Sequence, residues 1–231
     1  MKFIKKSFFS IFRRKSFVVY TAIFGDYDDL KNQEIKSEKY DLYCFTDNKN
    51  LKSKNFKIIY QKPTNQDSVR SAKIFKILPH KFLPQYEYSL WIDGSVLIKN
   101  PDLNLLIEKY LNNSDSALFK HPDRDCIYDE LEACIKLKKD EPAIMKKQIE
   151  KYRNENYPVH NGLAACTIIL RRHNSKKIKE LGESWWNEIE RGSKRDQLSF
   201  NYIAHRNNVK YQEIDGVLWD NNYFKILKHL K

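Results

Sequence analysis

The chain has 231 residues, of which 41% are hydrophobic and 13% aromatic, so it carries enough apolar material for one folded domain and is neither fibrous nor intrinsically disordered. Lys and Arg total 42 against 30 Asp and Glu, which gives a net charge of +12. Six of the basic side chains lie within residues 1–16. The remainder of the chain is therefore only moderately basic, and no nucleic-acid partner is expected.

The N-terminal segment, residues 1–16, combines these basic side chains with large apolar ones that would share one side of a short helix. The apolar members are Phe3, Ile4, Phe8, Ile11 and Phe12. Such a helix suits an anionic membrane surface, where each basic residue contributes about 1 kcal/mol, although a frayed, solvated terminus has the same composition. We expect a cytoplasmic protein, held peripherally on the inner face of the cytoplasmic membrane, with a single domain over residues 17–231.

The four cysteines are scattered along the chain and include no C-x-x-C pair, so a zinc ribbon or a thioredoxin-like site is not supported. They are Cys44, Cys126, Cys134 and Cys166. Most of them lie within apolar segments, where a cysteine is usually a small core residue. A reducing compartment fits this usage best.

Short apolar runs alternate with amphipathic segments along the chain. In chain order, strands are predicted at 17–23, 40–45 and 56–60, a helix capped by Asp67 follows, and then strands at 88–92 and 96–98. A helix at 103–111, a short strand at 117–119, one or two helices within 125–155, a strand at 163–170, helices at 175–191 and 193–206, and a strand at 209–214 complete the pattern. This alternation predicts an α/β domain in which helices flank a mostly parallel, Rossmann-like central sheet.

Ligands of such sheets bind at the carboxyl ends of the strands, and here those ends carry polar residues. They carry Gly25-Asp26, Thr46-Asp47, Asp93-Gly94-Ser95 and, at the entry to the 163–170 strand, Asn161-Gly162. Carboxylates with basic residues nearby in sequence suit a metal-assisted site for an anionic substrate. The glycine-rich dinucleotide, P-loop and nucleophile-elbow motifs are absent from the sequence, which argues against dehydrogenases, kinases and α/β-hydrolases.

Several short motifs, in their order along the chain, carry a family resemblance over roughly residues 17–215. They are Tyr20 to Asp28 (YTAIFGDYD), Tyr43 to Asp47 (YCFTD), Arg70-x-x-Lys73, Leu90 to Ser95 (LWIDGS), His121-Pro122-x-Arg124 and Asn161-Gly162. The chain resembles the family called domain of unknown function 616 and, more distantly, is similar to glycosyltransferase family 8, whose members are retaining enzymes of the GT-A fold. The resemblance implies a GT-A-like bacterial enzyme that moves a sugar from a UDP-sugar to a glycan or lipid-linked glycan, in surface polysaccharide or lipopolysaccharide synthesis, with retention.

The resemblance also implies a divalent cation, Mn²⁺ or Mg²⁺, that neutralises the departing diphosphate. In GT-A enzymes a D-x-D motif ends the strand that corresponds to residues 88–92, which makes Asp93 the expected metal ligand and a catalytic residue. The motif is Asp-Gly-Ser here, so Ser95 replaces the second carboxylate and is a weak substitute. His229 has the late position of a third ligand, and a solvated terminal histidine is the alternative.

Further donor-binding residues are carried over from the same resemblance. They are Thr21, Ala22, Phe24 and Asp47 for the nucleoside, Arg70 and Lys73 for the diphosphate or sugar, and Gly94, Asn161 and Gly162 for close backbone approach. Arg70 and Lys73 stand at i and i+3 and share one helix face, which a solvated basic face continued by Lys76 would explain equally simply. Asp47 and Asn161-Gly162 are also ordinary turn-forming residues.

The remaining candidates have competing structural interpretations. His121, Asp123 and Arg124 either bind the acceptor or donor sugar or form the start of a helix. Trp186 either stacks on an acceptor sugar or packs in the core. Asp196 and its neighbour Gln197 either face the reacting sugar, where Asp196 would stabilise the transition state, or belong to a capping box that begins at Ser193.

A non-catalytic module that binds anionic glycans or nucleic acid is the alternative function, and the missing second acid of D-x-D favours it.

Overall fold

The computed structural model describes residues 16–25, 28–33, 38–64 and 67–227. Residues 1–15 of the predicted membrane-binding segment lie outside this range, as does His229, so both interpretations stay predictions. No helix in the described part of the chain is long and apolar enough to cross a membrane.

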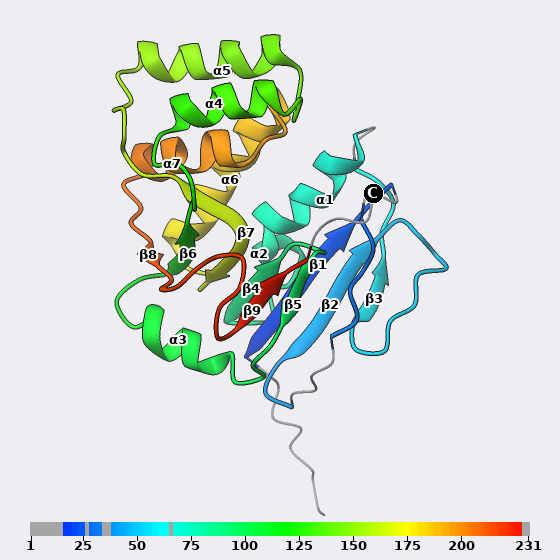
Figure 1. The fold of residues 1–231 in the computed structure, drawn as a ribbon. Helices are drawn as coiled ribbons and strands as arrows, with labels where there is room; N and C mark the ends of the chain where they lie inside the picture. The colour runs from blue at the N-terminus through cyan, green and yellow to red at the C-terminus, as the bar shows by residue number, and fades with distance from the viewer. Residues whose placement is uncertain (1–15, 26–27, 34–37, 65–66, 228–231) are drawn as a thin grey trace, which may run out of the picture.

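A seven-stranded sheet forms the centre of the molecule, in the order β3-β2-β1-β4-β7-β6-β8 (Figure 1). Its strands are β1 (Phe17–Ile23), β2 (Asp41–Thr46), β3 (Lys57–Tyr60), β4 (Tyr88–Ile92), β6 (Ser116–Lys120), β7 (Ala164–Arg171) and β8 (Gln212–Glu213). Strand β7 pairs antiparallel with both β4 and β6, and the other pairings are parallel. The prediction of a mostly parallel sheet is therefore confirmed.

Helices and a small second sheet cover the two faces of the central sheet. The helices are α1 (Ser68–Ile77), α2 (Pro79–Phe82), α3 (Asn104–Tyr110), α4 (Ile127–Lys136), α5 (Pro142–Asn154), α6 (Lys176–Arg191) and α7 (Gln197–Arg206). Strands β5 (Val96–Ile98) and β9 (Phe224–Ile226) pair antiparallel and, with α3, lie on the face opposite α1 and α6 (Figure 1).

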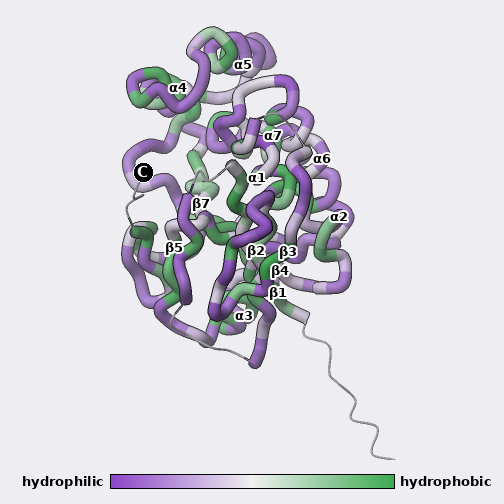
Figure 2. Tube along the Cα trace, turned by 90° about the vertical axis from the view of Figure 1, so that its right-hand side faces the viewer, coloured by the Kyte–Doolittle hydropathy of each residue, from purple (hydrophilic) through white to green (hydrophobic). Residues whose placement is uncertain are grey.

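The sequence of β1 is a continuous apolar run because the sheet is buried on both faces. Val18 and Tyr20 belong to the core under α1, α6 and α7, whereas Phe17 and Val19 belong to the core under α3 and β9. All seven residues of β1 are buried, as expected for a strand between two layers. Figure 2 shows hydrophobic residues concentrated along the inner strands, with hydrophilic stretches on the outside.

Most predicted helices and strands are present. The differences arise where tertiary contacts determine the length or presence of an element. Asp67 caps α1 as predicted, with its carboxylate accepting from the backbone N–H groups of Val69 and Arg70. The last predicted strand is shortened to Gln212–Glu213, and β9 and the short α2 were not predicted. The four cysteines are buried and free, in agreement with their prediction as core residues.

His173, two residues after the end of β7, gives the fold a testable pH dependence. Burial lowers the pKa of His173 to about 4, although its Nε2 atom lies 3.0 Å from the Leu83 carbonyl oxygen. The unfolded chain therefore binds a proton between pH 6.5 and 4 that the folded protein excludes. Stability is full above pH 6.5, and as pH falls to 4 the protein loses up to about 3 kcal/mol through this group.

The substitution His173→Gln tests this pH dependence, because glutamine keeps a donor for the Leu83 carbonyl and does not titrate in this range. Urea unfolding of both proteins from pH 7 to pH 4 is the measurement. We expect the wild-type protein to lose more stability than the variant on acidification. Parallel profiles of the two proteins would contradict the assignment.

Candidate active site

The topology brings the predicted polar residues to one edge of the sheet. Asp47 and Asp93 follow the carboxyl ends of β2 and β4, and His121 follows that of β6. Because β7 runs in the opposite direction, Asn161-Gly162 enters at this same edge, and the backbone N–H of His121 donates to the Leu163 carbonyl at 2.8 Å. The sequence-based prediction that these residues share one edge is confirmed.

The loop after β1 is held by Asp47 and Gly25. Both carboxylate oxygens of Asp47 accept the backbone N–H of Gly25, each at 3.1 Å. Gly25 has φ +63°, and a Cβ atom at this position would lie 2.6 Å from Cβ of Ser68 in α1. Only glycine meets both conditions, so the loop runs tightly between β2 and α1. The observed role of Asp47 is to position this loop.

Four side chains form a buried ionic group, which we call the lysine–aspartate cluster: Lys73, Lys76, Asp93 and Asp196. The Asp196 carboxylate lies 2.9 Å from Lys73 Nζ through Oδ1 and 2.6 Å from Lys76 Nζ through Oδ2. Lys76 Nζ also donates to Asp93 Oδ1 at 3.3 Å. The Asp196 side chain is 4% exposed and that of Asp93 is 36% exposed, so Asp93 is the member that faces solvent.

Burial and opposite charges compete in setting the pKa values of Asp196 and the two lysines. Burial raises the pKa of Asp196, but the ammonium groups of Lys73 and Lys76 outweigh burial and hold that pKa well below its usual value. Burial lowers the pKa of Lys76, yet Asp196 and Asp93 outweigh it and raise the pKa overall. For Lys73, burial outweighs the attraction of Asp196 and lowers the pKa. Asp196 thus favours the ammonium form of Lys76 and partly offsets the effect of burial on Lys73.

Asp93 is fixed in orientation by its neighbours. Its Oδ1 accepts from the indole Nε1 of Trp91 at 2.7 Å as well as from Lys76, and the Lys76 ammonium lies 5.4 Å from the Trp91 ring centroid. Trp91 and Asp93 are two residues apart at the end of β4, so their side chains point to the same face. One carboxylate oxygen of Asp93 remains for a ligand.

A second carboxylate lies beside this strand end. Oδ2 of Asp28 lies 2.9 Å from the point where a side chain on Gly94 would begin, so glycine leaves the space that the Asp28 carboxylate fills. Two carboxylates at one tip are suitable donors for a hard cation such as Mg²⁺ or Mn²⁺. Ser95 is 2% exposed, and its carbonyl accepts from the backbone N–H of Leu227, the last described residue. By donor type, the carboxylates of Asp93 and Asp28 suit the predicted cation, whereas the buried Ser95 side chain does not present itself at this tip.

A second group of charges lies between the loop after β6 and the start of α7. Glu130 is 1% exposed and accepts from Arg124 Nε at 2.7 Å, while its other oxygen lies 3.5 Å from Arg195. Arg195 also donates to the Gln197 side chain. Together with the lysine–aspartate cluster and Asp28, four cations (Lys73, Lys76, Arg124 and Arg195) face four carboxylates (Asp28, Asp93, Asp196 and Glu130). These fixed charges balance, so a cation held at Asp93 would supply the positive charge for an anionic ligand.

His121 lies next to Glu130 of this group, and its side chain holds the loop after β6 in place. Its Nδ1 accepts the backbone N–H groups of Asp123 and Arg124, each at 3.2 Å. Burial lowers its pKa, so the neutral ring is favoured. The Asp123 side chain is exposed, and Arg124 is half-buried against Glu130. The structure thus shows a positioning role for His121 and leaves Arg124 and Asp123 at the surface of the site.

Other predicted donor-binding side chains are occupied by the protein itself. The Arg70 guanidinium donates to Asp67 at 2.9 Å, to the Gly192 carbonyl at 2.7 Å and to the Ile189 carbonyl at 3.1 Å, which ties α1 to the end of α6. The side chains of Thr21 and Phe24 are about 1% exposed, and Phe24 stacks on Phe75. Ala22 in β1 is buried as well, so none of these three residues presents its side chain to a nucleoside in this structure.

Asn161, Gly162 and the tryptophans complete the predicted set. Asn161 is exposed, and Gly162 has φ +82°. Trp185 is in the core, with its indole Nε1 donating to Ser199 Oγ at 3.1 Å. Trp186 is half-buried on α6 and packs against the core.

The capping-box interpretation of Ser193 and Asp196 is wrong. Helix α7 begins at Gln197, and the Asp196 side chain makes no capping hydrogen bond. Ser193 Oγ instead donates to Asp140 at 2.7 Å, and the Lys194 backbone N–H donates to the same carboxylate at 2.8 Å. The segment 193–196 is held outside the helix by these contacts and by the two lysines of α1.

The sequence matches a known protein family over most of its length. Residues 4–229 match the model of the TOD1/MUCI70 glycosyltransferase-like domain. The chain belongs to this family.

Two curated relatives from Arabidopsis thaliana are longer than this chain. The chain is 28% identical over 223 residues to the probable hexosyltransferase MUCI70, covering 83% of the chain and 38% of that protein. It is 26% identical over 228 residues to the alkaline ceramidase TOD1, covering 84% of the chain and 49% of that protein. The chain thus spans less than half of either relative.

Solved structures show the same fold. Mouse xyloside xylosyltransferase 1 superposes with a TM-score of 0.50 at 12% identity, over 87% of this chain and 85% of that one. The TOD1/MUCI70 domain described here therefore has a GT-A-like fold, as predicted.

Five contributors to the site of this TOD1/MUCI70 domain were not predicted from sequence: Asp28, Lys76, Trp91, Glu130 and Arg195. Two of them carried a weak signal, because Lys76 continues the i, i+3 spacing of Lys73 and Trp91 is two residues before Asp93 in a strand. Glu130 and Arg195 had none, since a charged residue in an amphipathic helix or a loop is usually solvated.

A cavity of about 770 Å³ lies elsewhere, at the amino edge of the sheet beside Asp115 and Arg172. We place the chemistry at the carboxyl edge because the buried ionic groups and the solvent-facing Asp93 are there.

Proposed function

We propose that this protein is a glycosyltransferase that uses a nucleotide-diphosphate sugar. The lysine–aspartate cluster carries this proposal: Lys76 is buried, Asp196 and Asp93 raise its pKa, and it adjoins the partly exposed Asp93 at the ligand-binding edge of a GT-A-like sheet. The Lys76 ammonium, together with a cation held at Asp93, would stabilise a diphosphate leaving group. Membership of a glycosyltransferase-like family supports the same conclusion.

We further propose that Asp93 and Asp28 hold the cation, Mn²⁺ or Mg²⁺, with Ser95 and His229 as the remaining candidates. When bound, this ion neutralises charge that develops on the leaving diphosphate. Lys76 fixes one oxygen of Asp93, and Trp91 fixes the same oxygen from the side of the strand. The pair holds the carboxylate in one orientation at the strand end.

The finer features of the reaction are proposals of the same kind. UDP as the nucleotide, a glycan acceptor and retention follow from the resemblance to glycosyltransferase family 8. Both oxygens of Asp196 contact lysines and its side chain is 4% exposed, so we assign it a positioning role rather than that of a covalent nucleophile. Arg124 and Arg195 are the side chains we assign to the anionic part of the donor, and Asp123 and Trp186 to the acceptor.

Thermal unfolding with UDP, in the presence and absence of Mn²⁺, tests the donor class. A ligand at 100 times its Kd stabilises the folded state by about 2.7 kcal/mol, which raises the midpoint of unfolding by several degrees. We expect UDP with Mn²⁺ to give this shift and UDP with a chelator to give a smaller one. Turnover of a panel of UDP-sugars then identifies the sugar.

The alternatives give different results in the same experiment. A module that only binds anionic glycans would be stabilised by an acidic polysaccharide and not by any nucleoside diphosphate. Ceramide hydrolysis without a nucleotide requirement would place the protein with the ceramidase named among its relatives. Either result would contradict the proposed transferase.

A further inference from the structure

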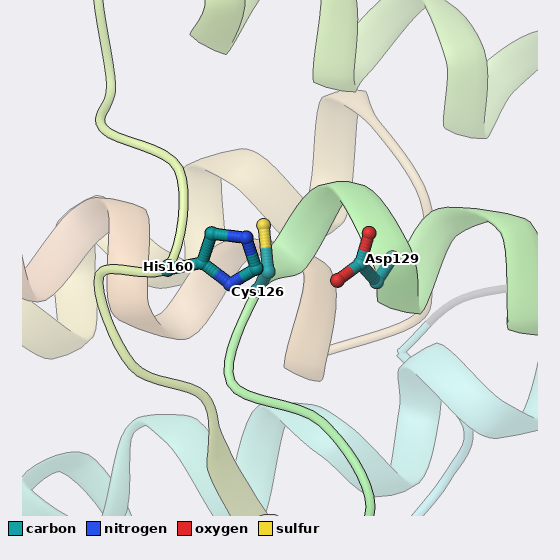
Figure 3. Close-up of side chains that lie close together, drawn as sticks. All are labelled: Cys126, Asp129 and His160. Carbon is teal, nitrogen blue, oxygen red and sulfur yellow. The ribbon is translucent and has the colours of Figure 1, made fainter.

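A second group of metal-ligating side chains uses none of the residues of the proposed active site. Cys126 immediately precedes α4, Asp129 lies in the first turn of α4, and His160 lies between α5 and β7. The Cys126 sulfur, a carboxylate oxygen of Asp129 and a ring nitrogen of His160 all lie within 4.8 Å of one another (Figure 3). We propose that these three side chains bind Zn²⁺.

The donor set selects the metal. Thiolate and imidazole are characteristic ligands of zinc, and a carboxylate is its common third partner, whereas Mg²⁺ and Ca²⁺ prefer oxygen alone. Three protein ligands leave the fourth tetrahedral position to water. The site is thus chemically distinct from the two carboxylates proposed to hold Mn²⁺ or Mg²⁺ beside β4.

The geometry is close to that of a tetrahedral site. Ligand atoms at the usual zinc distances lie roughly 3.3–3.8 Å apart, so a contraction of about 1 Å closes the group. Cys126 is 2% exposed and provides a rigid anchor. The side chain of His160 is 63% exposed, and Asp129 is exposed too, so small rotations of these two side chains supply the movement.

A carboxylate also orients the histidine. Asp125 Oδ1 lies 2.8 Å from His160 Nδ1. The proton of a neutral imidazole is placed on Nδ1 by this contact, and Nε2 is left unprotonated for the metal. Zinc-bound histidines characteristically carry such a partner, and its removal weakens metal binding by about 10–100-fold. In Figure 3 a ring nitrogen of His160 is turned toward the thiol.

A zinc ion here would join two loops at the carboxyl edge of the sheet. Cys126 is two residues after Arg124, and His160 directly precedes Asn161-Gly162. The two loops are already linked by the hydrogen bond from the His121 backbone N–H to the Leu163 carbonyl. The ion would hold both segments in one position, and this effect does not depend on sugar transfer.

Titration of the full-length, metal-free protein with Co²⁺ and Zn²⁺ tests the site. We expect the thiolate-to-cobalt charge-transfer band to saturate at one Co²⁺ per chain, and Zn²⁺ to abolish it by displacement. Cys126→Ser and Cys126→Ala should lose the band, and Asp125→Asn should bind Zn²⁺ about 10–100-fold more weakly in competition with a chromophoric chelator. His160→Gln, at an exposed position, should weaken binding at least as much.

Cys44→Ala is the matched control, because Cys44 is also buried and free but lies in β2. It should keep the cobalt band and the zinc affinity of the wild-type protein. A cobalt spectrum without the thiolate band, or unchanged zinc affinity in His160→Gln, would overturn the proposal. Neither result depends on transferase activity, so failure of the zinc site and failure of the proposed function are separable.

Discussion

The substitution Asp196→Asn is expected to lower the free energy of unfolding by about 3–5 kcal/mol, because it removes the one carboxylate that both buried lysines contact. Lys73 lies 2.9 Å and Lys76 2.6 Å from this carboxylate, and the Asp196 side chain is 4% exposed. With a neutral amide at this position, the two ammonium groups stay close together. Of the two carboxylates in the cluster, only Asp93 then remains to balance their charge. Urea unfolding at pH 7 measures the effect.

Asp102→Asn provides the matched control, since Asp102 forms an ion pair with Lys39 at 2.6 Å but its side chain is 51% exposed. Exposed pairs contribute at most about 1 kcal/mol, so this variant should retain nearly all of its stability. Similar losses in the two variants would contradict the buried-cluster interpretation. Asp196→Asn should also reduce turnover with the donor, because Lys76 is held next to Asp93 through this cluster.

The second large effect is expected at Asp93. Asp93→Asn should reduce turnover by on the order of 100-fold or more and remove its dependence on Mn²⁺ concentration. The loss of a metal ligand removes several kcal/mol of charge stabilisation from the transition state, and each 1.36 kcal/mol changes the rate about tenfold. The amide still accepts from Trp91 and Lys76, so the variant should fold. Steady-state kinetics across a range of Mn²⁺ concentrations measures this, together with the UDP-induced shift in unfolding temperature.

Asp220→Asn is the control for this experiment. Asp220 forms an ion pair with Lys99 at 2.5 Å, and its side chain is 53% exposed, away from the strand end that carries Asp93. Turnover and metal dependence should match the wild-type protein. If Asp93→Asn retained wild-type turnover with unchanged Mn²⁺ dependence, the proposed role of Asp93 as a metal ligand would be refuted, while the stability prediction for Asp196 would stand.

These two predictions depend on contacts that join distant parts of the chain. Lys73 and Asp196 are 123 residues apart in sequence, and each has an ordinary local explanation, a basic helix face or a helix cap. Only the packing of α1 against the start of α7 makes them neighbours. The same holds for Glu130, which joins Arg124 and Arg195 from inside α4.

What local sequence determined is the part of the fold that depends on periodicity and turn chemistry. The continuous apolar run of β1 specified a strand buried on both faces, and Asp67 specified the start of α1, because burial and capping act over a few residues. The polar residues after β2 and β4 specified which edge of the sheet carries a site, since parallel strands bring their carboxyl ends together.

The tertiary structure alone decided which of those residues are free to act. Arg70 and Asp47 had the right chemistry for a ligand, but their hydrogen-bonding atoms are engaged by Gly192 and Gly25 in the folded protein. Asp28 reaches the strand end only because Gly94 leaves room for its carboxylate. Charge and hydrogen-bonding capacity belong to single residues, whereas burial and partners are properties of the packed chain.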